Sequence, residues 1–170
     1  MSVSEDGDMS EGASTYVHRR FARFHADNAS GFLLRHAVRL YNAALQRRLG
    51  ALDCATGQYP LLLFLWEKDG QTETELGRKA RISQPTLVRT LDRMVDAGLI
   101  RRRRSTADKR AVEVSLTGKA RQRQTALLDA GMAVEEQALA GLAPDERAAL
   151  NDLLRRVVAN LEAGGRDPAE

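Results

Sequence analysis

Ten residues near the middle of the chain combine a high density of positive charge with a single acid. Between Arg101 and Arg110 there are six lysines or arginines, and the one acid is Asp108. Guanidinium and ammonium groups pair with phosphate oxygens, and an arginine such as Arg110 can enter a narrow minor groove, where the potential is most negative. The segment therefore suggests contact with the DNA backbone, although charge alone also fits an ordinary solvated surface.

Side chains suited to reading base edges precede this basic segment. They lie on one face of a predicted helix, opposite its apolar stripe, and comprise Gln84, Pro85, Val88, Arg89 and Asp92, with Thr86 and Arg93 at the margins. Glutamine can pair bidentately with adenine, and arginine with guanine, in the major groove. An exposed first turn with such groups is typical of a recognition helix, whereas without a basic neighbour the pattern would favour a plain amphipathic surface helix.

The predicted recognition helix begins after Ser83 and ends before Gly98. Its apolar residues Leu87, Leu91 and Met94 fall at i, i+4 and i+7, which places them on one buried stripe. Serine is well placed to cap the first turn, and glycine is typical of a helix end. This spacing turns the polar face outward.

Two short strands are predicted after this helix and form a wing. Ile100 begins the first strand, and apolar and polar residues alternate over 112–116, as in a half-buried strand. The tip between them, at 105–110, is polar and basic. Asp108 either holds the Arg110 guanidinium as a charge pair or serves the turn itself.

The remaining elements are predicted to be helical, because apolar residues recur at helical spacing. The segments are 29–49, 56–68, a short helix and turn at 72–83, then 117–139 and 144–164. We expect Thr56 to cap the second segment and Pro144 to open the last one. The first and last helices carry longer apolar stripes than a small winged domain could cover, which predicts packing against a second subunit.

Composition and charge restrict the class of protein. Of the 170 residues 29% are charged and 5% aromatic, which favours a helical protein over a β-sandwich. Residues 71–121 hold thirteen basic and six acidic residues, a net charge of +7, so the rest of the chain carries −4 of the overall +3. No apolar run approaches the roughly 20 residues of a membrane span. The absence of a signal-peptide pattern and the lone Cys54 lead us to expect a cytoplasmic protein.

No pattern of catalytic residues emerges from the sequence. His18 and His25 could share a helix face, but they lack nearby cysteines or carboxylates at metal-ligand spacing. We find no nucleophile motif, phosphate loop or convergent carboxylate pair. We therefore expect no catalytic site, no metal and no cofactor.

Four motifs together are similar to those of one family. They are Leu76-Gly-Arg-Lys-Ala, Ile82-Ser-Gln-Pro-Thr-Leu-Val-Arg-Thr-Leu-Asp-Arg-Met, Ala97-Gly-Leu-Ile-Arg-Arg and Asp108-Lys-Arg110. With these motifs the chain resembles the MarR family of bacterial transcription regulators over about residues 31–161. It departs slightly from the family pattern after the wing, where Ala120 stands at a position that often holds glycine.

The resemblance implies a mainly α fold. A winged helix-turn-helix with a two- to three-stranded wing would join N- and C-terminal helices that form the dimerisation domain of a homodimer. We accordingly divide the chain into a disordered acidic tail at 1–15, dimerisation helices at 16–55, a DNA-binding domain at 56–117 and further dimerisation helices at 118–164.

The resemblance also implies a repressor that binds double-stranded operator DNA. The residues expected at the DNA are Ser83, Gln84, Pro85, Thr86, Arg89, Arg93, Arg103, Asp108, Lys109 and Arg110. The helix would lie in the major groove, and Arg110 would enter the minor groove. Dimer symmetry then predicts a pseudo-palindromic operator whose half-sites lie one turn apart, about 34 Å.

Members of the family usually respond to a small molecule, often an aromatic or phenolic acid. Such a ligand binds between the dimer helices and the winged domain and changes DNA affinity, which is a linkage between two sites. The candidate lining residues are Arg35, His36, Arg39, Tyr41 and Tyr59. A cation among them could pair with a carboxylate. The alternative is that they are surface arginines and tyrosines at the edge of the core.

Two other modes of action remain open at the level of sequence. The protein could be a DNA-binding regulator or an architectural protein without small-molecule control. It could also sense oxidants through Cys54, as some relatives do through a cysteine near the start of the first helix. Cys54 lies instead between the first two helices, has no second cysteine to resolve a sulfenic acid, and fits a small buried hydrophobic residue better.

Overall fold

The computed structural model describes residues 29–104, 108 and 110–164, which form a winged unit and a helical frame. The winged unit comprises α3 (Tyr59–Glu67), β1 (Gln71–Thr72), α4 (Glu73–Ala80), α5 (Gln84–Asp96), β2 (Ile100–Arg104) and β3 (Val112–Leu116). The helical frame comprises α2 (Ser30–Gly50), α7 (Gln124–Ala138) and α8 (Pro144–Gly164), and the short α6 (Gly118–Gln122) leads from the wing into α7. The fold is therefore mainly helical, as predicted.

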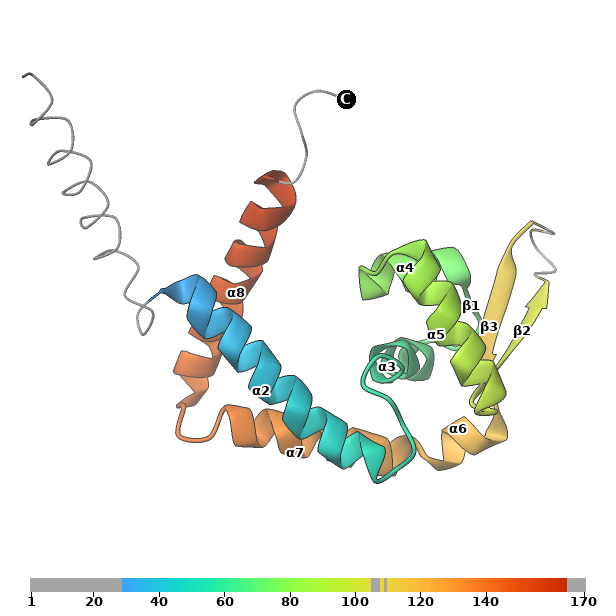
Figure 1. The fold of residues 1–170 in the computed structure, drawn as a ribbon, viewed down its shortest axis with the longest axis horizontal. Helices are drawn as coiled ribbons and strands as arrows, with labels where there is room; N and C mark the ends of the chain where they lie inside the picture. The colour runs from blue at the N-terminus through green and yellow to red at the C-terminus, as the bar shows by residue number, and fades with distance from the viewer. Residues whose placement is uncertain (1–28, 105–107, 109, 165–170) are drawn as a thin grey trace, which may run out of the picture.

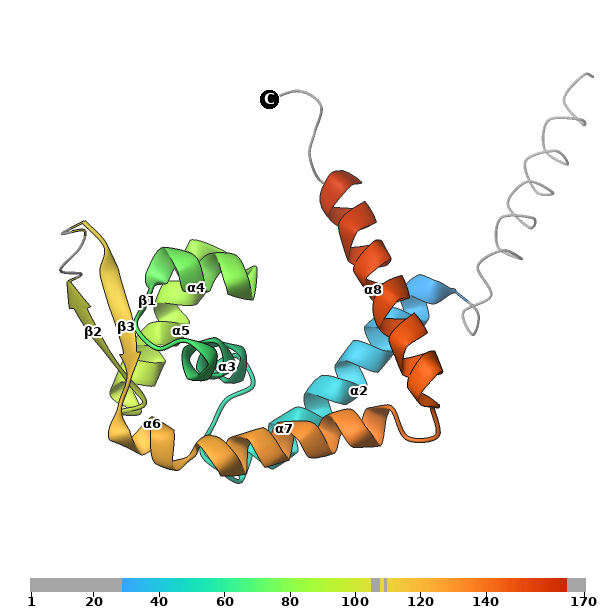
Figure 2. The same ribbon diagram turned by 180° about the vertical axis from the view of Figure 1, so that it is seen from behind.

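The winged unit lies at one end of α7 and α8 at the other. In Figure 1, α7 runs along the bottom of the molecule, leads through α6 to the winged unit, and has α2 packed along it. The view from behind shows the same arrangement, with α8 rising from the end of α7 that is remote from the wing (Figure 2). An ion pair of 2.7 Å between Arg81, after α4, and Glu162 of α8 joins the two parts across the opening.

The wing is a three-stranded antiparallel sheet in the order β1-β3-β2. Ile100 pairs with Leu116 and Arg104 with Val112, so the two long strands align over their full length. Val114 and Leu116 are buried while Glu113 and Ser115 are partly exposed, which confirms the predicted alternation, although Val112 at the start of the strand is only partly buried. β2 is an edge strand, and it carries arginine at four of its five positions.

Local signals explain the helices α4 and α5. Thr72 and Glu75 form a reciprocal capping box at the start of α4, and these hydrogen bonds lower the pKa of Glu75. Leu87, Leu91 and Met94 of α5 are fully buried, as the helical spacing predicts. The positions of Ser83 before α5 and of Gly98 after it, with Gly98 at φ 66°, also agree with the sequence prediction.

One hydrophobic core joins the winged unit to the frame. The largest fully buried side chains include residues from every helix of the winged unit, from the turn between α5 and β2, and from the two frame helices that approach it: Leu49, Leu61, Leu62, Leu65, Leu76, Leu87, Leu91, Met94, Leu99 and Leu127. Leu49 lies in the last turn of α2 and Leu127 in the first turn of α7. The frame is thus packed against the winged unit rather than tethered to it by a loop.

Three local predictions were wrong. α3 begins at Tyr59 with Gln58 in the N-cap position, so Thr56 does not cap it; its hydroxyl instead donates to the Gln46 side chain at 3.4 Å. The predicted continuous helix at 117–139 is divided by a turn at Arg123 into α6 and α7. Ser83 occupies the N-cap of α5, but its hydroxyl bonds to that of Thr86 at 2.9 Å rather than to the backbone.

The outer helices of the frame leave much apolar surface exposed. No residue of α8 is buried, and the exposed fractions of Leu153 and Leu161 are 55% and 72%. On α2, Phe32 and Leu33 are 43% and 50% exposed. Monomeric proteins seldom expose large continuous apolar patches, so these faces of α2 and α8 are candidate interaction surfaces.

None of the helices in the described part of the chain is both long enough and apolar enough to span a membrane. The acidic segment at 1–15, the two histidines His18 and His25, and Lys109 lie outside the described residues.

Candidate nucleic-acid interface

The face of α5 that was predicted to read DNA is open to solvent. The residues Ser83, Gln84, Pro85, Thr86, Arg89 and Arg93 are all exposed, because the apolar stripe of the helix turns inward. Thr90, behind this face, donates to the carbonyl oxygen of Thr86 at 2.8 Å. The first two turns of α5 therefore present amide, hydroxyl and guanidinium groups outward, as base-edge recognition requires.

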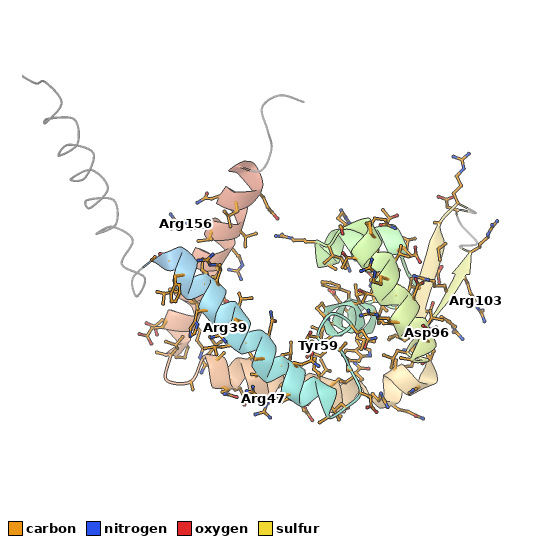
Figure 3. All side chains as sticks on the ribbon, in the orientation of Figure 1. Arg39, Arg47, Tyr59, Asp96, Arg103 and Arg156 are labelled. Atoms are coloured by element: carbon orange, nitrogen blue, oxygen red, sulfur yellow. The ribbon has the colours of Figure 1, made fainter. Side chains whose placement is uncertain are left out.

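The wing adds a basic edge beside this helix. Arg103 is exposed on β2, directly opposite Glu113 of β3, and Figure 3 places it at the outer edge of the winged unit. Arg110 is also exposed, at the start of the return from the wing tip. The winged unit thus exposes amide, hydroxyl and guanidinium groups on α5 and further guanidinium groups on the wing.

Asp108 takes part in the turn that precedes Arg110. Its Oδ1 accepts a hydrogen bond from the backbone N–H of Arg110 at 2.9 Å. This is an Asx-type contact, and of the two interpretations of Asp108 it supports turn chemistry. The carboxylate thereby fixes the backbone that carries the Arg110 side chain.

The arginines of this surface differ in their partners. Among the described residues, Arg89, Arg93 and Arg103 have no carboxylate within ion-pair distance. Arg102 is different, because its guanidinium pairs with Glu73 and with Asp92. Arg102 was not among the predicted contact residues, yet strand alternation offered a signal: Arg102 is two residues from buried Ile100 and so faces the same side.

The five candidate ligand residues fall into two groups. Arg35, His36 and Arg39 are exposed on α2, where the Arg39 guanidinium lies 3.2 Å from His36 Nδ1. Tyr41 and Tyr59 instead face α7: the Tyr41 hydroxyl donates to Glu135 at 3.2 Å, and Tyr59 is buried. Burial raises the pKa of both tyrosines, with a further contribution from Glu135 for Tyr41.

A hollow of about 480 Å³ lies elsewhere, between Arg81 and α8. It is lined by α8 residues from Asn151 to Glu162, and none of the five candidate ligand residues contributes to it. Figure 3 shows Arg39 on α2 and Tyr59 at the start of α3. The candidate ligand site therefore does not coincide with this hollow.

Cys54 is buried between α2 and α3, and only 2% of it is exposed. Its Sγ donates to the carbonyl oxygen of Ala55 at 3.6 Å. Burial raises the pKa of the thiol to about 11, and the nearby Arg123 offsets only part of this effect. At pH 7 about one molecule in 10⁴ would then carry the reactive thiolate.

Replacing Cys54 with serine should leave the response of the protein to an organic hydroperoxide unchanged. The buried thiol is protonated at neutral pH and has little access to solvent, so it is a poor nucleophile towards peroxide. DNA affinity measured before and after cumene hydroperoxide, for wild type and variant, tests this. Peroxide release of the wild type but not of Cys54→Ser would contradict it.

Comparisons with known proteins agree with this geometry. The sequence model of the MarR family matches residues 56–112. An organic hydroperoxide resistance transcriptional regulator of Bacillus subtilis is 34% identical over 101 residues, which cover 59% of this chain and 69% of the relative.

Solved structures of relatives extend the similarity beyond the winged unit. A MarR-family transcriptional regulator from Silicibacter pomeroyi is 31% identical with a TM-score of 0.68, covering 82% of this chain and 94% of the other. A MarR variant from E. coli complexed with operator DNA is 27% identical with a TM-score of 0.71, covering 79% and 96%. The sequence motifs, the winged unit and these relatives agree: the chain belongs to the MarR family of transcription regulators.

Proposed function

We propose that this MarR-family regulator acts as a homodimeric repressor. It binds a pseudo-palindromic operator and is released from it by a small aromatic or phenolic acid. The observation that carries the DNA-binding part is the solvent-exposed polar face of α5, together with the exposed arginines of the neighbouring wing. In this proposal α5 reads bases in the major groove, and Arg110 enters the minor groove.

The dimer is proposed from the apolar surface of the frame. The exposed stripes of α2 and α8 suit a symmetric interface in which each copy covers the same faces of the other. We accordingly assign dimerisation to residues 16–55 and 118–164, and DNA binding to residues 56–117. A two-fold axis would then present two recognition helices to half-sites about 34 Å apart.

Ligand control is proposed from the way the frame meets the winged unit. Tyr41 and Tyr59 lie at this junction, and Arg35, His36 and Arg39 follow the exposed face of α2. If the carboxylate of an aromatic acid pairs with these cations in only one conformation of the dimer, the acid stabilises that conformation. The protein is released from the operator if the two recognition helices in this conformation are no longer spaced to match the two half-sites.

The first test compares specific with non-specific DNA across a salt series. Fluorescence anisotropy would follow binding to the intergenic DNA upstream of the protein's own gene, to a duplex selected from a random pool, and to a scrambled duplex. We expect the best duplex to keep an affinity margin of roughly 10³ or more over scrambled DNA. Arg110→Ala should weaken operator binding by about tenfold or more, whereas Arg48→Ala, an equal charge change on exposed α2, should not.

The same assay tests ligand control with salicylate and related aromatic acids as probes. Release of the operator at millimolar probe, accompanied by a change in Trp66 fluorescence, is the expected result. No release by any aromatic acid would restrict the function to DNA binding without this control. Equal and weak binding to all three duplexes would contradict sequence-specific recognition.

A further inference from the structure

We propose that Arg102 is a positioning residue for DNA binding. It fixes the recognition helix α5 to the wing and to α4, and it neutralises Asp92 on the face of α5 that meets DNA. The inference rests on the proposed function of α5 and the wing. This role distinguishes Arg102 from the neighbouring arginines, with which it forms one run of basic residues in the sequence.

One guanidinium connects three elements of the winged unit. Arg102 Nε on β2 lies 2.7 Å from Glu73 Oε1 at the first residue of α4. A terminal nitrogen pairs with the Asp92 carboxylate of α5, and the other donates to the carbonyl oxygen of Val88, one turn earlier, at 3.3 Å. The planar fork of arginine suits such a divided set of acceptors, and lysine could not make it.

The orientation of Arg102 follows from the sheet. Strand alternation places it on the same side as buried Ile100, while Arg101 and Arg103 point to the other side. Its side chain is only 25% exposed, and that of Glu73 19%. The contact with Asp92 is a charge-assisted hydrogen bond, whereas Nε meets Glu73 as an ion pair without hydrogen-bond geometry.

The pairing of Arg102 with Asp92 also neutralises a carboxylate on the face of α5 that is proposed to meet DNA. Asp92 is on the exposed face of α5, three residues after Arg89, and its side chain is 54% exposed. An unpaired carboxylate there would repel phosphates of the operator. Because Arg102 on β2 supplies the opposite charge, α5 keeps Asp92 at this position without presenting an unpaired negative charge to DNA.

Positioning matters because bases and phosphates are contacted by different elements. Phosphate contacts by the wing set the register on the duplex, and base-edge contacts by α5 carry the specificity. A fixed angle between β2 and α5 lets both sets form together without an ordering cost on binding. Loss of Arg102 should therefore reduce base reading more than phosphate contact.

The test replaces Arg102 with glutamine and measures binding to the selected duplex and to scrambled DNA across a salt series. We expect operator affinity to fall by about tenfold to a hundredfold, the range for losing a base-edge contact, and scrambled affinity to fall much less, because only the repulsion of phosphates by the unpaired Asp92 acts on it. The salt slope should be unchanged, because Arg102 contacts no phosphate. The matched control Arg103→Gln should lower the slope by about 0.9 on both DNAs, as for one lost phosphate contact.

Asp92→Asn provides a second variant that keeps the arginine and the fold. It should also shrink the specific margin, without reducing the salt slope, because the tie to α5 is lost. A salt slope that falls in Arg102→Gln as in Arg103→Gln would make Arg102 a phosphate contact and overturn the inference. An unchanged margin in both variants would overturn it as well. Wild-type protein that binds neither DNA would instead refute the proposed function.

Discussion

Replacing Val157 with glutamate should convert the protein from a dimer into a monomer and abolish specific operator binding. Val157 lies in the apolar stripe of α8 with Leu150, Leu154 and Leu161, and no residue of this helix is buried within the chain. The folded subunit therefore tolerates a charge there. In the proposed dimer the carboxylate would be buried without a partner, in both copies, at a cost of several kcal/mol each.

The loss of the dimer leaves one recognition helix for one half-site. The specific margin of roughly 10³ should then largely disappear, while weak salt-dependent binding to any duplex remains. Analytical ultracentrifugation gives the oligomeric state, and anisotropy gives the affinities. Ala163→Glu is the control, because it adds the same charge six residues away on the opposite face of α8. A Val157→Glu protein that still sediments as a dimer would show that this stripe is not the interface.

Replacing Gly131 with alanine should destabilise the protein and weaken its binding to the operator. Gly131 is a buried residue of α7, and a Cβ atom there would lie 2.0 Å from the Tyr59 hydroxyl oxygen and 2.6 Å from Cζ. Glycine within a helix normally costs about 1 kcal/mol relative to alanine. The clash outweighs that gain, so we expect a net loss of about 1–3 kcal/mol in the free energy of unfolding.

The effect on DNA binding arises because Tyr59 begins α3 and Gly131 lies in the frame. The helix α7 must move away from α3 to admit a methyl group, and this changes the angle at which the frame holds the winged unit. Denaturant unfolding and operator anisotropy measure the two effects. Gly118→Ala has no atom within 4 Å of the new Cβ and serves as the control.

A second substitution tests whether Tyr59 is the cause. Removing the hydroxyl with Tyr59→Phe takes away the nearest clashing atom but leaves the ring carbon at 2.6 Å. The double variant should therefore recover part of the lost stability and operator affinity. If the double variant showed no recovery, or if Gly131→Ala alone had no effect, the contact between Gly131 and Tyr59 would not be what holds the frame against the winged unit.

Much of the winged unit could be predicted from the sequence, because its signals are local. The spacing of Leu87, Leu91 and Met94 fixes the inner face of α5, and Gly98 marks its end. The alternation over 112–116 fixes the inner face of β3. These patterns identify the exposed residues of the candidate DNA surface without any tertiary information.

One failed prediction, the cap by Ser83, was lost to Thr86 in the same turn, whereas the others involve contacts more distant in sequence. The turn between α6 and α7 occurs at Arg123, where no glycine or proline interrupts the helical pattern; the Arg123 guanidinium instead contacts the carbonyl oxygen of Leu52 at 3.3 Å. Thr56 looked like a helix cap, but α3 starts three residues later. The role of Arg102 could be recognised only once the structure showed it beside Glu73 and Asp92, which are 29 and 10 residues away in the sequence.

The arginines of β2 also have a consequence for the protein in the absence of DNA. A sheet edge exposes unpaired N–H and C=O groups that can pair with the edge of another molecule. Two β2 strands brought side by side would place arginine next to arginine at nearly every position, and like charges directly opposite each other are destabilising. The charge that is proposed to bind the wing to phosphate therefore also opposes edge-to-edge pairing of free copies, a route by which unbound regulator would otherwise aggregate.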